Sequence, residues 1–148
     1  MLGILFTIAS CRNHRHSYNR KQRVFTIPKA ATNSDMTGFR VSGYYLDSSE
    51  DNQDILGNKL YTYQDYLNYK SKYVSLRVDT DVIPIRSLVT TSEFLRYGSP
   101  VKFVACDVSN TVKGNHISIC TDSTSSLSKF TKYDITIHVS SQSYNIYP

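Results

Sequence analysis

The chain has 148 residues, which is enough for one domain with a buried core, and its 40% hydrophobic content excludes a largely disordered protein. Its net charge of +5 is unevenly distributed. Five basic residues precede Val24, whereas twelve basic and twelve acidic residues follow from there on. A near-neutral net charge argues against the extended basic face that nucleic-acid binding requires. The composition therefore predicts no nucleic-acid partner.

The first 23 residues are expected to lie outside the folded domain. The apolar run Met1–Ser10 is shorter than the ~20 residues that span a bilayer, and it ends in small residues before Cys11. This resembles the lipobox of bacterial lipoproteins, so a processed signal and membrane attachment through Cys11 are predicted. A start further upstream, or an ordinary helix or strand, is the alternative. We interpret residues 12–23 as a basic linker, 24–141 as one domain and 142–148 as a tail, with no metal or cofactor.

Alternating polar and apolar residues in short runs predict strands throughout the domain. Loops are expected between them at Ala30–Gly38 and Asp47–Gly57, which are rich in turn-forming residues. The predicted strands are Val24–Pro28, Phe39–Leu46, Tyr73–Val78, Val82–Val89, Val101–Cys106, His116–Cys120 and Asp134–Ser140. Pro84 cannot donate a backbone hydrogen bond, so its strand should lie at a sheet edge or begin at the proline.

Helical spacing is confined to short segments. One short helix is expected within Leu60–Tyr73 and one helical turn within Thr91–Tyr97. A third short helix should contain Leu127 and Phe130, with Ser123 as its N-cap. Short strands, short connections and no long helix together predict an all-β or β-dominated barrel.

The stretch Phe103–Cys120 is the most informative for function. A buried strand ends at one carboxylate, Asp107, and a polar turn with a Lys-Gly-Asn step leads into the next strand. An aspartate at a strand end is most often a turn or cap residue, because its side chain bonds nearby backbone amides. Spacing alone therefore does not assign Asp107 a catalytic role.

This stretch resembles the signature of the three-aspartate (3D) domain, which occurs in the membrane-bound lytic transglycosylase A family and related cell-wall proteins. The residues that match this signature in register are Val104, Ala105, Asp107, Val112, Lys113, Gly114, His116, Ile117 and Ile119. Two further segments also match in order along the chain, Val78–Ile85 and Ser42–Tyr45.

The resemblance implies a six-stranded double-psi β-barrel with one or two short helices, located in the cell envelope and acting on peptidoglycan glycan strands. It also implies a lytic transglycosylase, which cleaves the MurNAc–GlcNAc bond without water and leaves a 1,6-anhydro end. Asp107 would be the acid and base, with Asp79 or Asp81 beside it. A neighbouring carboxylate raises the pKa of such an acid by like-charge repulsion.

The chain departs from the family pattern at two places. Ser109 and Asn110 stand where the family has two glycines, and Ser118 stands where it has its last aspartate. A serine hydroxyl is a poor proton donor near neutral pH. Two hypotheses therefore stay open: a transglycosylase with Asp107 and Asp79, and a catalytically inactive glycan-binding or structural envelope barrel. A secreted effector is a further alternative.

The resemblance suggests Lys113, Gly114, His116, Ser118 and Tyr45 as substrate-binding residues. Each of the first two charged candidates has an alternative without a ligand. Lys113 can be a solvated turn residue, and His116 can be a structural histidine held by hydrogen bonds. Tyr44 and Tyr45 alternate along a strand, so only one of them can face a sugar. Cys106 and Cys120 are expected to be either a disulfide or two buried thiols.

Overall fold

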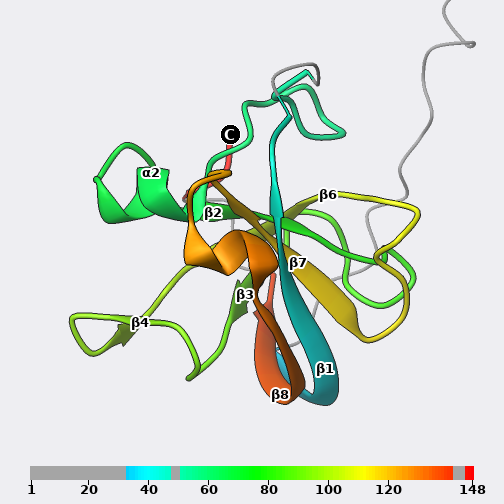
Figure 1. The fold of residues 1–148 in the computed structure, drawn as a ribbon. Coiled ribbons are helices and arrows are strands. Elements are labelled where there is room, and N and C mark those ends of the chain that lie inside the picture. Colours follow the sequence, from blue (N-terminus) through cyan, green and yellow to red (C-terminus); the bar gives the residue numbers. More distant parts are fainter. Residues whose placement is uncertain (1–32, 48–50, 142–145) are drawn as a thin grey trace, which may run out of the picture.

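A computed structural model describes residues 33–47, 51–141 and 146–148, and Figure 1 shows their arrangement. Six strands close into one barrel in the order β1-β7-β2-β6-β3-β8. The barrel strands are β1 (Ser34–Tyr45), β2 (Val74–Arg77), β3 (Leu88–Thr90), β6 (Phe103–Asp107), β7 (His116–Thr121) and β8 (Thr131–Ser140). The described residues also form two helical turns, α2 (Tyr63–Leu67) and the 3₁₀ turn η1 (Ser126–Lys129), and a separate two-stranded sheet. This confirms the predicted class, a β-dominated chain with a closed six-stranded barrel and short helices.

Parallel and antiparallel pairs are mixed around the barrel. β1 pairs with β7 and β2 pairs with β6 in parallel, whereas the other four contacts are antiparallel. Figure 1 shows β1 and β8 running side by side as the two longest strands. Parallel neighbours end at the same side of a sheet. The residues that follow β2 and β6 therefore come close together although about 30 positions separate them.

The barrel interior is filled by one side of each strand. Phe39, Leu76, Phe103, Ile119 and Ile137 are almost completely buried there. Burial of a side chain of this size contributes about 2 kcal/mol, so the alternation of polar and apolar residues is sufficient to orient each strand. The prediction that Ile135, Ile137 and Val139 share the buried face of the last strand is confirmed.

A second apolar cluster packs outside the barrel against β6 and β7. It contains Cys106, Cys120, Tyr73 and Tyr147. Tyr147 belongs to the segment predicted as a tail, yet it is buried, it donates a 2.5 Å hydrogen bond to Asp54 and it accepts one from Asn58. Cys106 and Cys120 are both free thiols, and burial raises the pKa of each to about 12. Of the two alternatives for these cysteines, the structure shows two buried thiols.

Several predicted element boundaries are wrong. β1 begins at Ser34, inside the expected loop, because Ser34–Met36 pair with β8. The predicted strand Val82–Val89 is reduced to β3, with turns before it. β3 has a partner on both sides, β6 and β8, so it is not an edge strand. The strand does not begin at Pro84 either, because Pro84 lies among the turns before β3.

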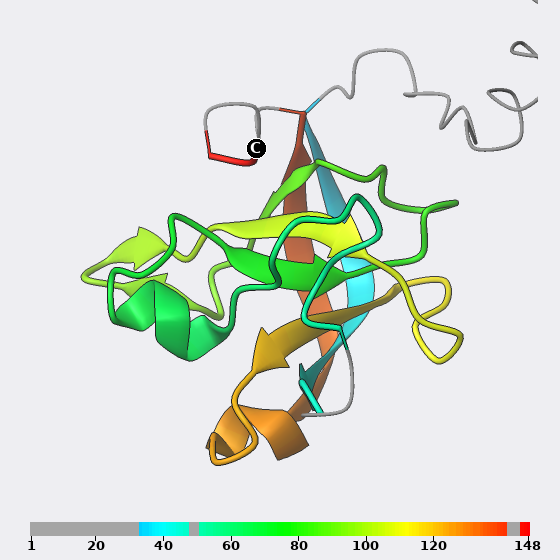
Figure 2. The same ribbon diagram turned by 90° about the horizontal axis from the view of Figure 1, so that it is seen from above.

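Two short helical predictions also need correction. The turn expected within Thr91–Tyr97 is instead a small hairpin of β4 (Leu95–Arg96) and β5 (Ser99–Pro100), which projects beside α2 in Figure 2. The third helix is η1, and its N-cap is Ser125 rather than Ser123. The short helix expected within Leu60–Tyr73 is α2, which begins with a Thr62–Asp65 capping box. The strand predicted at Val24–Pro28 lies outside the described residues.

Within the described ranges, neither helical segment has the length and apolar character of a membrane-spanning helix.

Candidate functional site

One side of the barrel carries a polar groove of about 300 Å³, which we call the His116 groove. It lies where β1, β2 and β7 meet the 108–115 loop and the connection from η1 to β8. Its lining includes the polar and charged side chains of Arg40, Ser42, Arg77, His116, Ser118 and Lys129. Two of the predicted substrate-binding residues, His116 and Ser118, thus lie in one groove.

A chain of hydrogen bonds crosses the groove floor. Ser42 on β1 and Ser118 on β7 are direct partners in the parallel ladder, and the Ser42 hydroxyl donates to Oγ of Ser118 at 3.0 Å. Nε2 of His116 lies 2.8 Å from Oγ of Ser42, and Nδ1 lies 3.3 Å from the carbonyl oxygen of Thr111. Parallel register brings these two hydroxyls together from positions 76 residues apart. The groove floor therefore offers hydroxyl and imidazole groups for polar contacts with a ligand.

Asp107 is the last residue of β6 and lies beside this groove rather than in its lining. Its Oδ2 accepts a hydrogen bond from Nε of Arg77 at 2.8 Å, and both side chains are largely buried. Cζ of Arg77 stacks 3.7 Å from the centre of the Tyr44 ring. The carboxylate that the family resemblance proposes as the acid is thus bonded by a guanidinium group that also stacks on an aromatic ring.

Asp79 follows β2 and contacts the loop after β6. Its Oδ2 accepts the backbone N–H of Gly114 at 2.7 Å, and its Oδ1 accepts that of Asp81 at 3.0 Å. These two hydrogen bonds, that of Gly114 first, lower the pKa of Asp79 below its usual value. Asp79 is therefore ionised at neutral pH and anchors the loop that leads to His116.

The two predicted acids come from adjacent strand ends but make separate contacts. The backbone N–H of Val78 donates to the Asp107 carbonyl oxygen at 3.0 Å, which joins the end of β2 to the end of β6. The side chain of Asp107 then bonds Arg77, whereas that of Asp79 bonds Gly114. Each carboxylate has a structural partner of its own.

The remaining predicted residues lie outside the groove lining. Lys113 is exposed on the loop, and Gly114 contributes its backbone N–H to Asp79. Tyr45 is 55% exposed, whereas its neighbour Tyr44 lines the groove. Strand alternation correctly required only one of the two tyrosines to face the groove, and the structure shows that this one is Tyr44.

Sequence reasoning missed Arg40, Ser42, Arg77 and Lys129. Ser42 lies in a segment that matches the family pattern, but the match directs attention to Tyr44 and Tyr45 beside it. Arg77 ends an otherwise apolar strand, and a lone charge at such a position could have marked it as the partner of an acid. Lys129 reaches the groove only because η1 packs on β1, and nothing in the local sequence indicates that contact.

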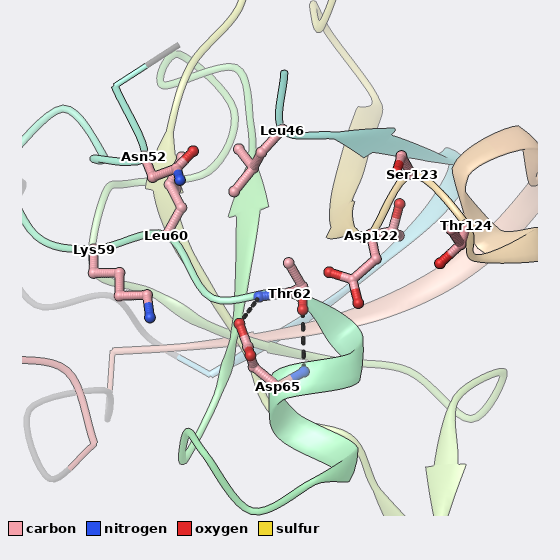
Figure 3. Close-up of a pocket in the computed structure, with 10 residues that line it drawn as sticks. Leu46, Asn52, Lys59, Leu60, Thr62, Asp65, Asp122, Ser123 and Thr124 are labelled. Atoms are coloured by element: carbon pink, nitrogen blue, oxygen red, sulfur yellow. Dashed lines mark hydrogen bonds between the residues drawn. The ribbon is translucent and has the colours of Figure 1, made fainter. Parts of the chain in front are cut away.

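A second hollow of about 380 Å³ lies near the end of β7 (Figure 3). Its polar lining includes Lys59, Thr62, Asp65, Asp122, Ser123 and Thr124. Asp65 is held by the capping box, since its Oδ2 accepts the backbone N–H of Thr62 at 3.0 Å. Figure 3 shows the Asp122 side chain pointing into the hollow. Asp122 and Ser118 line different hollows, so Asp122 does not replace the missing family aspartate in the His116 groove.

In comparisons with known proteins, no family model, no curated protein and no solved structure matches this chain. The similarity to the three-aspartate domain therefore stays a prediction from the motifs quoted above.

We expect acid to destabilise the fold through His116. Burial, and next the neighbouring Arg40, lower the pKa of His116 below its ordinary value of 6.5. The unfolded chain then binds a proton at a higher pH than the folded protein. The stability that neutral His116 contributes is thus fully present above about pH 6.5. It is lost as the pH falls towards the lowered pKa of His116 in the folded protein. Urea unfolding between pH 7.5 and 5 should show this loss, and His116→Gln should remove part of it. An identical pH dependence in the variant would contradict this role.

Proposed function

We propose that this barrel binds a glycan strand of the cell wall in the His116 groove without cleaving it. The observation that carries the proposal is the chemistry of the groove lining. Within the described residues that lining contains hydroxyl, imidazole, guanidinium and ammonium groups together with Tyr44, but no carboxylate. Sugars are bound through hydrogen bonds to their hydroxyls and contacts with aromatic rings. The family resemblance suggests the glycan, and the groove offers suitable binding groups.

The contacts of the two proposed acids favour binding over cleavage. A general acid must reach the leaving oxygen within hydrogen-bond distance and must hold a proton at the working pH. Asp107 bonds Arg77, and two backbone N–H groups lower the pKa of Asp79, which is opposite to the shift that a proton donor needs. Ser118, at the family's last aspartate position, supplies a hydroxyl to the hydrogen-bond chain. This combination supports the inactive alternative among the hypotheses from sequence.

The envelope location belongs to the same proposal. Peptidoglycan glycan strands would be the partner, and attachment through Cys11 would hold the barrel near them. Cys11 and the basic linker lie outside the described residues.

Incubation with purified peptidoglycan sacculi tests the proposal. We expect the protein to sediment with the sacculi and to release no 1,6-anhydro-muropeptides, as measured by mass spectrometry of the soluble fraction. Ser42→Val should weaken sedimentation because it removes the hydroxyl between His116 and Ser118, whereas Ser92→Val, outside the groove lining, should not. No sedimentation would refute the proposal. Release of anhydro products that Asp107→Asn abolishes would instead establish the transglycosylase.

A second candidate function is glycan cleavage in the hollow of Figure 3. Asp65 and Asp122 both line it. Most enzymes that cleave glycosidic bonds use a pair of carboxyl groups. Asp65 is engaged by its capping box, so Asp122 would be the acid. In the same digestion, products lost in Asp122→Asn but retained in Asp107→Asn would support this candidate.

A further inference from the structure

The His116 groove has an excess of positive charge. Arg40 and Lys129 are exposed in its lining, and neither forms an ion pair with any residue that the structure describes. Arg40 contacts the ring of Tyr133, with Cζ 5.7 Å from the ring centre. Arg77, the third cation of the lining, is paired with Asp107. Two cations thus face the groove, and no carboxylate of the described residues lines it or pairs with them.

Three separate elements supply these cations. Arg40 comes from β1, Arg77 from β2 and Lys129 from the last residue of η1. They converge although the barrel domain as a whole has equal numbers of acidic and basic residues from Val24 onward. A local cluster of one sign on a neutral protein attracts a ligand of the opposite sign. Neutral sugars would gain nothing from it.

We infer that the His116 groove selects a glycan that carries a carboxylate, with Arg40 and Lys129 binding the carboxylate while Ser42, Ser118 and His116 contact sugar hydroxyls. This rests on the proposed function and adds the substrate class to it. A guanidinium group can bind a carboxylate through two parallel hydrogen bonds, and an ammonium group adds charge. The lactyl group of MurNAc supplies such a carboxylate on glycan strands without peptides.

The pKa of His116 should change when a charged ligand binds in the groove. The His116 imidazole lies near Arg40 from β1, and Arg77 from β2 and Lys129 from η1 are the other cations of the described lining. Tyr44 also lines the groove, but its hydroxyl is buried. Burial, and next the charge of Arg40, lower the pKa of His116 and so favour the neutral imidazole. A carboxylate bound between these cations cancels part of their field and makes protonation easier. The pKa of His116 should therefore rise when an acidic glycan binds.

The test compares two forms of one sugar, a GlcNAc–MurNAc tetrasaccharide with free lactyl carboxylates and the same sugar with those groups converted to carboxamides. Calorimetry should show about tenfold tighter binding of the carboxylate form, as is usual for one charge-assisted contact. NMR titration of His116 should show a higher pKa with the carboxylate form only. Chitotetraose serves as a neutral sugar, and phosphorylated and sulfated oligosaccharides test whether any anionic group is sufficient.

The matched variants are Arg40→Gln/Lys129→Gln and Lys72→Gln/Lys102→Gln, which lose the same charge inside and outside the groove. The first variant should bind the carboxylate and carboxamide sugars with nearly equal affinity, and the second should keep the preference for the carboxylate form.

Equal binding of both sugar forms by the wild-type protein would refute the inference and leave the proposed function intact. Equal loss of preference in both variants would refute the assignment to this groove. No binding of any sugar would refute the inference and the proposed function together. Tighter binding of phosphorylated or sulfated sugars would show that the groove selects another anion.

Discussion

Gly43→Ala is expected to lower the free energy of unfolding by about 3 kcal/mol. A Cβ at this position would lie 1.8 Å from the carbonyl oxygen of Leu127 and 2.8 Å from its carbonyl carbon. Both are backbone atoms of η1, so no side-chain rotation relieves the overlap and the whole turn must move. Overpacking of this kind typically costs 1–3 kcal/mol, and backbone contact places Gly43 at the upper end of that range. Urea unfolding of the variant measures the loss.

The same substitution should weaken ligand binding. The backbone N–H of Gly43 donates to the carbonyl oxygen of Phe130 at 3.1 Å, so displacement of η1 also displaces Lys129 and the residues after it. Gly114→Ala is the matched control, because a Cβ there meets no atom within 4 Å and pays only for its φ of +62°. That conformation costs an alanine about 1 kcal/mol. If the two variants lost equal stability, close packing of η1 on β1 would not be the reason for glycine at position 43.

Arg77→Met is expected to destabilise the protein by about 3 kcal/mol. It leaves the buried Asp107 carboxylate without the guanidinium that bonds it, and removal of one partner of a buried pair costs roughly 3–5 kcal/mol. The lower figure applies because the Arg77 side chain keeps 20% of its surface exposed. Contact between Arg77 and the Tyr44 ring is lost as well. Chemical denaturation near neutral pH gives the value.

Two further variants separate the ion pair from the other contacts of Arg77. The double variant Arg77→Met/Asp107→Asn should recover part of the lost stability, because no unpaired carboxylate then remains. Lys132→Met breaks the exposed pair with Glu93 and should change stability by less than about 1 kcal/mol. An Arg77→Met variant that is no less stable than Lys132→Met would show that Asp107 does not need its partner. Asp107 would then again be a candidate for the acid that the resemblance to the three-aspartate domain suggests.

Local sequence pattern predicted most of the barrel strands because burial on a pleated strand has a period of two. The runs His116–Cys120 and Asp134–Ser140 alternate, and Val101–Cys106 is apolar except for Lys102; each forms a strand close to its predicted bounds. The pattern failed where pairing partners decide the structure. Ser34–Met36 look like a loop in isolation, yet they extend β1 because β8 lies beside them.

The candidate site was only half predictable for a related reason. His116 and Ser118 could be named because they fall within a motif that is continuous in sequence. Ser42, Arg77 and Lys129 come from three other elements and reach the same groove only when the barrel closes. Asp107 was correctly placed at a strand end, but its pairing with Arg77 depends on the parallel register of β2 and β6.

Composition and residue order alone were sufficient to predict a β-dominated fold and a near-neutral charge from Val24 onward, because alternation and burial act over a few neighbouring residues. Barrel closure decides which distant side chains meet, since register between strands is a property of the whole sheet. It joins Ser42 to Ser118 and Arg77 to Asp107, and it brings Arg40 and Lys129 into one groove. In the folded barrel, the predicted acids Asp107 and Asp79 therefore make structural contacts, and the groove beside them is lined by cations and hydroxyl groups.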